Sequence, residues 1–192
     1  MAKPMTCKDV MDAVVGFGNY CLWSPRRSTI ARNTHAINGW EADILIIQDS
    51  GRVYEVEVKV SVSDFRREFE VRTKKHKHRS ICTGIQQLSA YRSEPITLSR
   101  FYFAMPKDVY EKVKAEIPEY AGVIVVVPRD GMWGPKLIAR IEVQAPHLKG
   151  VAATDKHRVE VMRSVYLRAW GDGPIEISGN SGELEVGEVA CG

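Results

Sequence analysis

Two apolar segments separated by four turn-forming residues constrain the fold of this chain more than any other feature. Ala42–Gln48 and Val53–Val62 both have the length and the apolar content of strands, and Asp49–Arg52 between them reads Asp-Ser-Gly-Arg. Short polar connections that contain glycine are typical of β-hairpins. We therefore expect the two segments to pair as antiparallel strands.

The second segment carries charge on only one of its two sides. Because successive side chains of a strand point to opposite faces, its apolar residues share one face while Glu55, Glu57 and Lys59 lie on the other. In the first segment Asp43 falls on the charged side once the strands pair, with Glu41 in line. One interpretation is an exposed sheet face, on which cross-strand charge pairs contribute only roughly 0.2–1 kcal/mol each.

The other interpretation of this charged side is a metal site. Two carboxylates held close together raise each other's pKa unless a cation joins them, and such oxygen ligands suit Mg²⁺ or Mn²⁺. The ion would polarise a phosphoryl oxygen and lower the pKa of a bound water. Lys59 would orient that water or stabilise the developing negative charge. On these residues alone, both interpretations stay open.

Length and composition favour one cytoplasmic globular domain. The chain has 192 residues, 44% of them hydrophobic, and no apolar run approaches the length of a membrane span. Charges interrupt the N-terminal segment, which therefore does not resemble a secretory signal. The four cysteines form no CxxC pair, which argues against a disulfide framework and a zinc site. We expect a domain over residues 1–170 and an acidic, glycine-rich, mobile tail over residues 171–192.

The charge distribution points to a polyanionic partner. Residues 1–170 hold all 27 bases and 19 of the 24 acids, a net charge of +8. The densest basic stretch, Arg66–Arg79, directly follows the charged strand. Its lysines and arginines would contact DNA phosphates without reading sequence, although a solvated helix end is the simpler interpretation. His76 and His78 within it are poor metal ligands, because the neighbouring cations would repel a metal ion.

Helical and strand patterns alternate along the rest of the chain, which predicts an α/β fold. Residues 21–40 look irregular, and Ser63 is the expected cap of a helix that begins at Asp64. We expect the other helices over Lys8–Tyr20, Ile81–Tyr91, Asp108–Glu116 and Asp155–Trp170, and the other strands over Phe101–Met105, Ala121–Pro128 and Lys136–Val143.

The hairpin and its surroundings resemble the PD-(D/E)XK nuclease superfamily. The matching pieces are "EAD", with Asp43 as the first acid, and "EVK", which is Glu57-Val58-Lys59. The run from Trp40 to Gly131 is similar to small phage and bacterial members, including MmcB-like DNA-repair endonucleases, in which an "EVK" strand leads into an S-x-x-D-F-type helix and a basic segment.

The resemblance implies a restriction-endonuclease-like core, a central mixed sheet of four or slightly more strands flanked by helices. It also implies a metal-dependent deoxyribonuclease that hydrolyses phosphodiester bonds, with Mg²⁺ or Mn²⁺ held by Asp43, Glu57 and the Val58 carbonyl, and with Lys59 assisting the water. The upstream helical glutamate of many members has no evident counterpart, and Asp9 or Asp12 would have to replace it. The alternative is a catalytically silent nuclease fold kept for DNA binding or as a repair accessory.

The resemblance suggests DNA-contacting residues as well. "QLSAY" resembles the Q-x-x-x-Y helix of the recombination-exonuclease branch, although an ordinary amphipathic surface helix is the simpler interpretation. DNA is thus the expected partner, a homodimer fits the superfamily, and no membrane is expected. The expected DNA-contacting residues are Arg66, Lys74, Lys75, Lys77, Gln87 and Tyr91.

Overall fold

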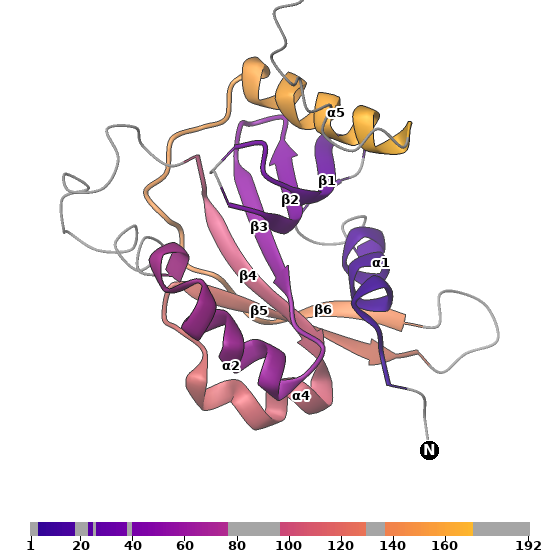
Figure 1. The fold of residues 1–192 in the computed structure, drawn as a ribbon, viewed down its shortest axis with the longest axis vertical. Helices are drawn as coiled ribbons and strands as arrows, with labels where there is room; N and C mark the ends of the chain where they lie inside the picture. Colours follow the sequence, from indigo (N-terminus) through magenta and orange to yellow (C-terminus); the bar gives the residue numbers. More distant parts are fainter. Residues whose placement is uncertain are drawn as a thin grey trace, which may run out of the picture.

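The computed structural model describes residues 4–17, 23–24, 26–37, 40–76, 97–129 and 137–170. Within them a six-stranded mixed sheet is flanked by helices, as the sequence predicts (Figure 1). The strands are β1 (Ser28–Thr34), β2 (Ala42–Gln48), β3 (Val53–Val58), β4 (Arg100–Pro106), β5 (Ala121–Pro128) and β6 (Leu137–Val143). The helices are α1 (Cys7–Phe17), α2 (Val62–Val71), α4 (Lys107–Val113), the 3₁₀ turn η1 (Lys114–Glu116) and α5 (Asp155–Ala169).

Neighbouring strands of the sheet are also consecutive in the chain, in the order β1-β2-β3-β4-β5-β6. The β1–β2, β2–β3 and β5–β6 pairs are antiparallel, whereas β3–β4 and β4–β5 are parallel. The expected hairpin is confirmed: Ile44 pairs with Val56 and Ile47 with Val53. Its turn contains Gly51 at a φ of 80°, a conformation that glycine adopts without steric cost.

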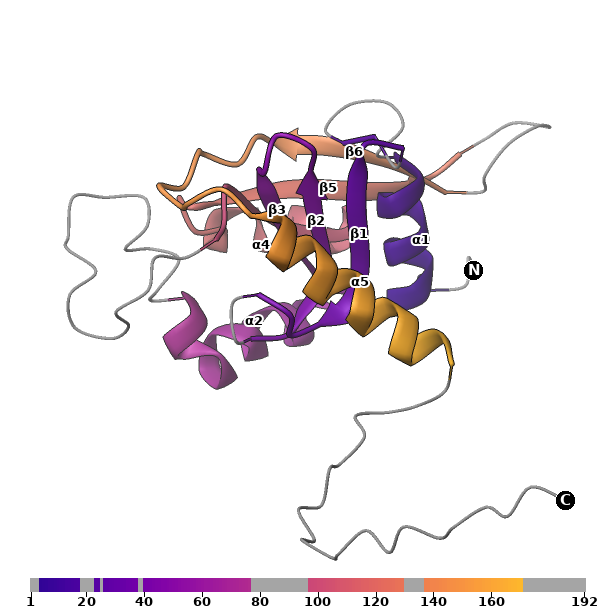
Figure 2. The same cartoon turned by 90° about the horizontal axis from the view of Figure 1, so that it is seen from above.

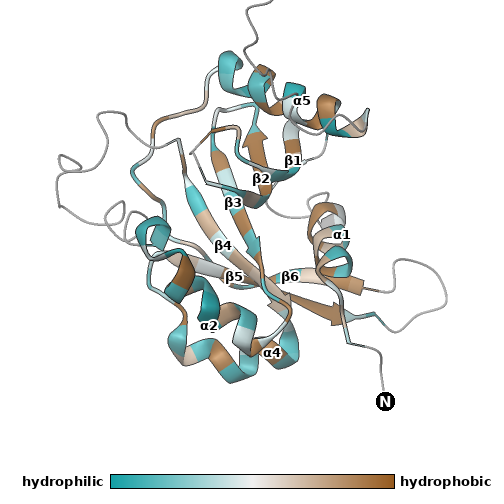
Figure 3. Cartoon of the chain, viewed as in Figure 1, coloured by the Kyte–Doolittle hydropathy of each residue, from teal (hydrophilic) through white to brown (hydrophobic). Residues whose placement is uncertain are grey.

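Each face of the sheet is covered by its own layer. On one face, α2, α4 and α5 contribute Phe65, Val109 and Val161 to a core that includes Phe101 and Phe103 of β4. On the other face, α1 packs against Tyr54, Val56 and Val58 of β3 and against their neighbours. Figure 2 shows α1 on the opposite side of the sheet from α2 and α4. In Figure 3 the strands are mainly brown or pale, whereas α2, α4 and α5 alternate between teal and brown, as amphipathic helices that cover a core do.

Several predicted elements are confirmed within one to three residues. β5 has the predicted bounds, and the other confirmed elements are α1, β4, α4 with η1, β6 and α5. Phe65 and Phe69 of α2 lie on the same side, with ring centroids 5.1 Å apart. The predicted helix over Ile81–Tyr91 and the tail over residues 171–192 lie outside the described residues.

Three local predictions are wrong. Residues 28–34 form the edge strand β1 instead of irregular chain, because β2 offers them a full hydrogen-bonding edge despite their polar sequence. The second hairpin strand ends at Val58 rather than Val62. The cap of α2 is Ser61, not Ser63, since Ser61 has extended backbone angles and its hydroxyl accepts from the amide of Asp64 at 3.1 Å.

None of the helices in the described ranges is long and apolar enough to cross a membrane.

The two glycines Gly122 and Gly16 predict opposite responses to the same substitution. A methyl group on Gly122 in β5 would lie 2.5 Å from both Tyr102 Cε1 and the Ala145 amide. We expect Gly122→Ala to lower the free energy of unfolding by roughly 1–3 kcal/mol through overpacking. A methyl group on Gly16 of α1 would have no atom of the described residues within 4 Å. Gly16→Ala should therefore raise the free energy of unfolding by up to about 1 kcal/mol, because alanine favours helix. Denaturant unfolding measures both, and a change of the same sign would contradict this packing.

Candidate active site

The hairpin brings Asp43 and Glu57 together. Continuing the β2–β3 register by one residue places the two directly opposite each other. The Val58 amide donates to Asp43 Oδ2 at 2.7 Å, which ties the first acid to the strand that carries the second. Lys59 Nζ lies 3.9 Å from Glu57 Oε2. The three expected site residues thus occupy one side of the hairpin.

This charged side is buried. Glu55 and Glu57 are each only 1% exposed and Lys59 is 6% exposed, beneath α2 and the residues after it. The interpretation of an exposed, solvated face is therefore wrong. Local alternation is as predicted, with Glu55 and Glu57 on the face opposite Tyr54, Val56 and Val58, but both faces are covered.

Two cations from the chain after α2 neutralise the acids of β3. Lys75 is fully buried, and its ammonium contacts Glu57 Oε1, Glu55 Oε1 at 3.0 Å and the Glu41 carbonyl at 3.0 Å. Arg72 is about one-third exposed and places Nη1 3.7 Å from Glu57 Oε2. Lys75 was expected to contact DNA phosphates, and in the structure it points into the protein instead. A buried carboxylate without a partner is costly, which explains the inward side chain.

Lys59 has a second buried partner, Glu68 of α2. Its ammonium donates to Glu68 Oε2 at 2.7 Å. The other oxygen, Oε1, lies 3.0 Å from His76 Nε2, and His76 Nδ1 lies 2.7 Å from the Tyr120 hydroxyl. Four side chains from separate parts of the fold therefore form one continuous hydrogen-bonded chain.

The acids of the site titrate in different directions. The pKa of Glu57 is raised to about 8, mainly by burial, which Lys75 opposes and the nearby Asp43 and Glu55 reinforce. Burial also raises the pKa of Asp43, against the Val58 amide, Lys59 and Lys75. Burial would raise the pKa of Glu68 too, but the hydrogen bonds from His76 and Lys59 lower it to about 2. Such divergence among neighbouring carboxylates is typical of functional sites.

The residues present suit a hard divalent cation with few protein ligands. Glu57 Oε2 is buried and accepts no hydrogen bond from the described residues, so it is available to a cation. Among the described residues, no group of three or more His, Cys, Asp or Glu side chains is arranged to hold a metal. A cation here would thus have Asp43 and Glu57 as its side-chain ligands. One or two carboxylates with water and substrate oxygens is a common set for Mg²⁺.

The other expected residues are divided between the surface and the undescribed chain. Lys74 is exposed, and Arg66 is exposed and forms a two-bond pair with Glu116. Lys77, Gln87 and Tyr91 lie outside the described residues, as does His78. Asp9 and Asp12 were the expected replacements for a helical glutamate. Both lie on α1 and have partners other than the hairpin acids. Asp9 bonds Thr6 at its N-terminus, and Asp12 pairs with Lys8 and Arg32.

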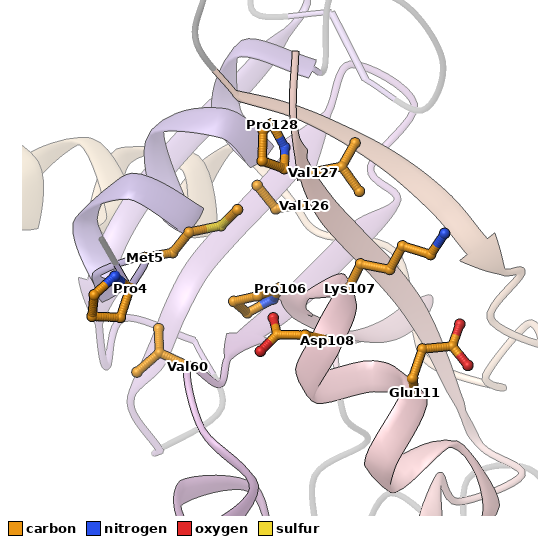
Figure 4. A pocket seen from close by; sticks show the side chains of 10 residues that line it. All are labelled: Pro4, Met5, Val60, Pro106, Lys107, Asp108, Glu111, Val126, Val127 and Pro128. Atoms are coloured by element: carbon orange, nitrogen blue, oxygen red, sulfur yellow. The ribbon is translucent and has the colours of Figure 1, made fainter. Parts of the chain in front are cut away.

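A hollow of about 690 Å³ opens at the ends of β4 and β5 (Figure 4). Its lining includes Met5, Val60 and Pro106 and the charged side chains of Lys107 and Asp108. Met5 and Val60 pack with the core on the α1 side of the sheet, the face opposite the hairpin acids. It is large enough for a nucleotide-sized group.

Sequence reasoning missed Glu68, His76 and Tyr120 as members of the site. Glu68 has a local signal, since it lies seven residues after Ser61 on the inner side of α2, next to Phe65. His76 and Tyr120 have none: His76 stands within a basic run that suggests a solvated surface, and Tyr120 is 44 residues further along the chain.

Comparison with known proteins defines the fold and leaves the chemistry open. No family model and no curated protein matches the chain. A solved structure of a protein of unknown function from Silicibacter pomeroyi is similar, with a TM-score of 0.52 and 12% identity over 88% of each chain. This likeness supports the α/β architecture alone.

The two glutamates predict opposite pH dependence of stability. Glu68 stabilises the folded state above about pH 4.5, because its pKa is lowered on folding. This contribution to the free energy of unfolding is lost as the pH falls towards about 2. The Glu57 contribution is present below about pH 4.5 and is lost as the pH rises through about 8. We expect Glu68→Gln to lose stability at neutral pH and to approach the wild type in acid. Glu57→Gln should gain on the wild type as the pH rises.

Thermal unfolding from about pH 3 to pH 9 measures both dependences, with Glu119→Gln as the exposed control. Parallel curves for Glu68→Gln and Glu57→Gln would contradict the opposite shifts of the two pKa values.

Proposed function

We propose that this protein is a metal-dependent deoxyribonuclease of the PD-(D/E)XK class. The observation that carries the proposal is the pair of the half-buried Asp43 and the buried Glu57, opposite each other on the hairpin, with Lys59 beside Glu57. A fold gains little stability from burying two acids side by side, because desolvation costs each ion several kcal/mol. Their retention is better explained by chemistry that needs them.

In this proposal Asp43, Glu57 and the Val58 carbonyl hold Mg²⁺ or Mn²⁺. When bound, the ion would polarise the scissile phosphate and lower the pKa of a water. Lys59 would donate to the phosphate oxygen on which charge develops, or to the attacking water. Val58 supports this arrangement through its amide, which orients Asp43.

Lys75 has a different role from the one expected from its sequence context. Its ammonium already contacts Glu57 Oε1, so it holds part of the positive charge that a metal would supply. With the cation bound, Lys75 would keep Glu55 neutralised while Glu57 turns Oε2 to the ion. DNA phosphates would be contacted by the exposed Lys74 and by residues of the basic run beyond it.

The same contact favours a second candidate function. Because Lys75 and Arg72 neutralise Glu57 without any metal, the cluster is also complete as a purely structural ion-pair network. A catalytically silent nuclease fold that binds DNA, as a repair accessory, would have this arrangement. The two candidates differ in whether Asp43 and Glu57 bind a divalent cation.

DNA cleavage tests the first candidate. Supercoiled, linear duplex and single-stranded DNA are incubated with Mg²⁺ or Mn²⁺ and with the wild type, Asp43→Asn or Lys59→Ala. We expect both variants to lose at least about a hundredfold in rate, because each lacks a group that acts on the reacting phosphate. Asp49→Asn and Lys114→Ala, which change exposed residues of the same types, should cut like the wild type.

The outcomes separate the candidates. Intact DNA with retained, salt-sensitive binding and no Mn²⁺ affinity would favour the accessory. Cleavage that survives both substitutions would place the active site elsewhere and contradict the proposal.

Salt dependence tests the DNA-binding surface separately. Each lost phosphate contact should reduce the slope of log K against log salt concentration by about 0.9 for duplex DNA. We expect Lys74→Ala to show this change, and Arg66→Ala to show less, since Arg66 is already paired with Glu116. Fluorescence anisotropy at several salt concentrations measures the slopes, with Lys114→Ala as the control. An unchanged slope in both Lys74→Ala and Arg66→Ala would exclude this surface.

A further inference from the structure

The chain Lys59–Glu68–His76–Tyr120 has a defined hydrogen-bond polarity. Glu68 is ionised, and an ionised carboxylate only accepts hydrogen bonds. His76 Nε2 therefore carries the proton that it shares with Glu68 Oε1. In a neutral ring this leaves Nδ1 to accept from the Tyr120 hydroxyl. With this tautomer, the hydrogen bonds from Tyr120 through His76 all donate towards the Glu68 carboxylate that binds Lys59.

Aromatic rings hold the histidine in place. The His76 ring lies 4.6 Å from Phe69 and 6.0 Å from Phe103, against which it is stacked at 25°. The ring of Phe101 stands edge-on to it, with centroids 6.0 Å apart. A buried imidazole enclosed in this way has little freedom to turn. Its hydrogen bond therefore fixes the orientation of the Glu68 carboxylate.

The consequence falls on Lys59. A lysine side chain has four rotatable bonds and is ordinarily mobile, yet this ammonium is held at 2.7 Å by one Glu68 oxygen and stays 3.9 Å from Glu57 Oε2. The hydrogen bond from Lys59 to Glu68 keeps the Lys59 ammonium from forming a direct ion pair with Glu57, such as the one that Lys75 forms. The Glu57 oxygen that faces Lys59 consequently remains without a hydrogen bond from the described residues.

We propose that Glu68, His76 and Tyr120 are positioning residues that hold the Lys59 ammonium beside the Asp43–Glu57 pair for reaction with a phosphodiester. This inference rests on the proposed nuclease function and deepens it. Tyr120 acts on Lys59 through His76 and Glu68.

Removal of one hydroxyl tests the distant end of the chain. Tyr120→Phe should reduce kcat for DNA cleavage by about tenfold, in the range found when groups that orient a site are lost, while KM and Mn²⁺ affinity stay unchanged. Tyr102→Phe is the matched control, because its buried hydroxyl bonds Gln144 on the other face of the sheet. The control should keep the wild-type kcat. Equal losses in both variants, or a normal kcat in Tyr120→Phe, would overturn the proposal.

A second measurement does not depend on cleavage. In protein carrying ¹⁵N-labelled lysine, the Lys59 ammonium resonance is assigned with Lys59→Arg. We expect slow proton exchange in the wild type, at least tenfold faster exchange in Tyr120→Phe and no change in Tyr102→Phe. A wild type that cuts no DNA would refute the nuclease, while this shift would still uphold the positioning. If Tyr120→Phe leaves the proton exchange of the Lys59 ammonium unchanged, the positioning role is refuted, whatever the cleavage result.

Discussion

The ion pair between Glu57 and Lys75 governs the architecture around the hairpin. Glu57 is buried at the middle of the sheet, where an unpaired carboxylate would cost several kcal/mol. Lys75 reaches it only because the chain after α2 turns back over β3. The same turn carries the next residue, His76, into the aromatic layer between α2 and β4. One electrostatic requirement therefore determines where a basic segment with no apolar pattern packs.

The two faces of β3 differ in what they bury. Tyr54, Val56 and Val58 join a core with α1, and this side provides hydrophobic stabilisation in the ordinary way. Its opposite side carries the acids within a second core rich in phenylalanine. Replacing such buried ion pairs by apolar side chains is often neutral or stabilising, so stability alone does not account for them. This asymmetry is the physical basis of the functional proposal.

The site lies where the strand pairing changes direction. β3 pairs antiparallel with β2 and parallel with β4. The antiparallel partner brings Asp43 opposite Glu57, whereas the parallel partner requires a long connection through α2, which supplies Glu68. The acids and their neutralising cations thus meet at one place, through connections that the topology requires.

The sequence by itself determined the local features of this protein. Alternation in β3 separates Glu57 and Lys59 from the valines, and the short turn brings Asp43 to the same side, because strand geometry and hairpin length depend only on neighbouring residues. Only the tertiary structure decided that this side is buried, that Lys75 points inward and that residues 28–34 become a strand. Each of these depends on partners distant in the chain. Tyr120 reaches His76 across 44 residues, and no local pattern records a contact that arises when α2 and the start of β5 pack on one sheet.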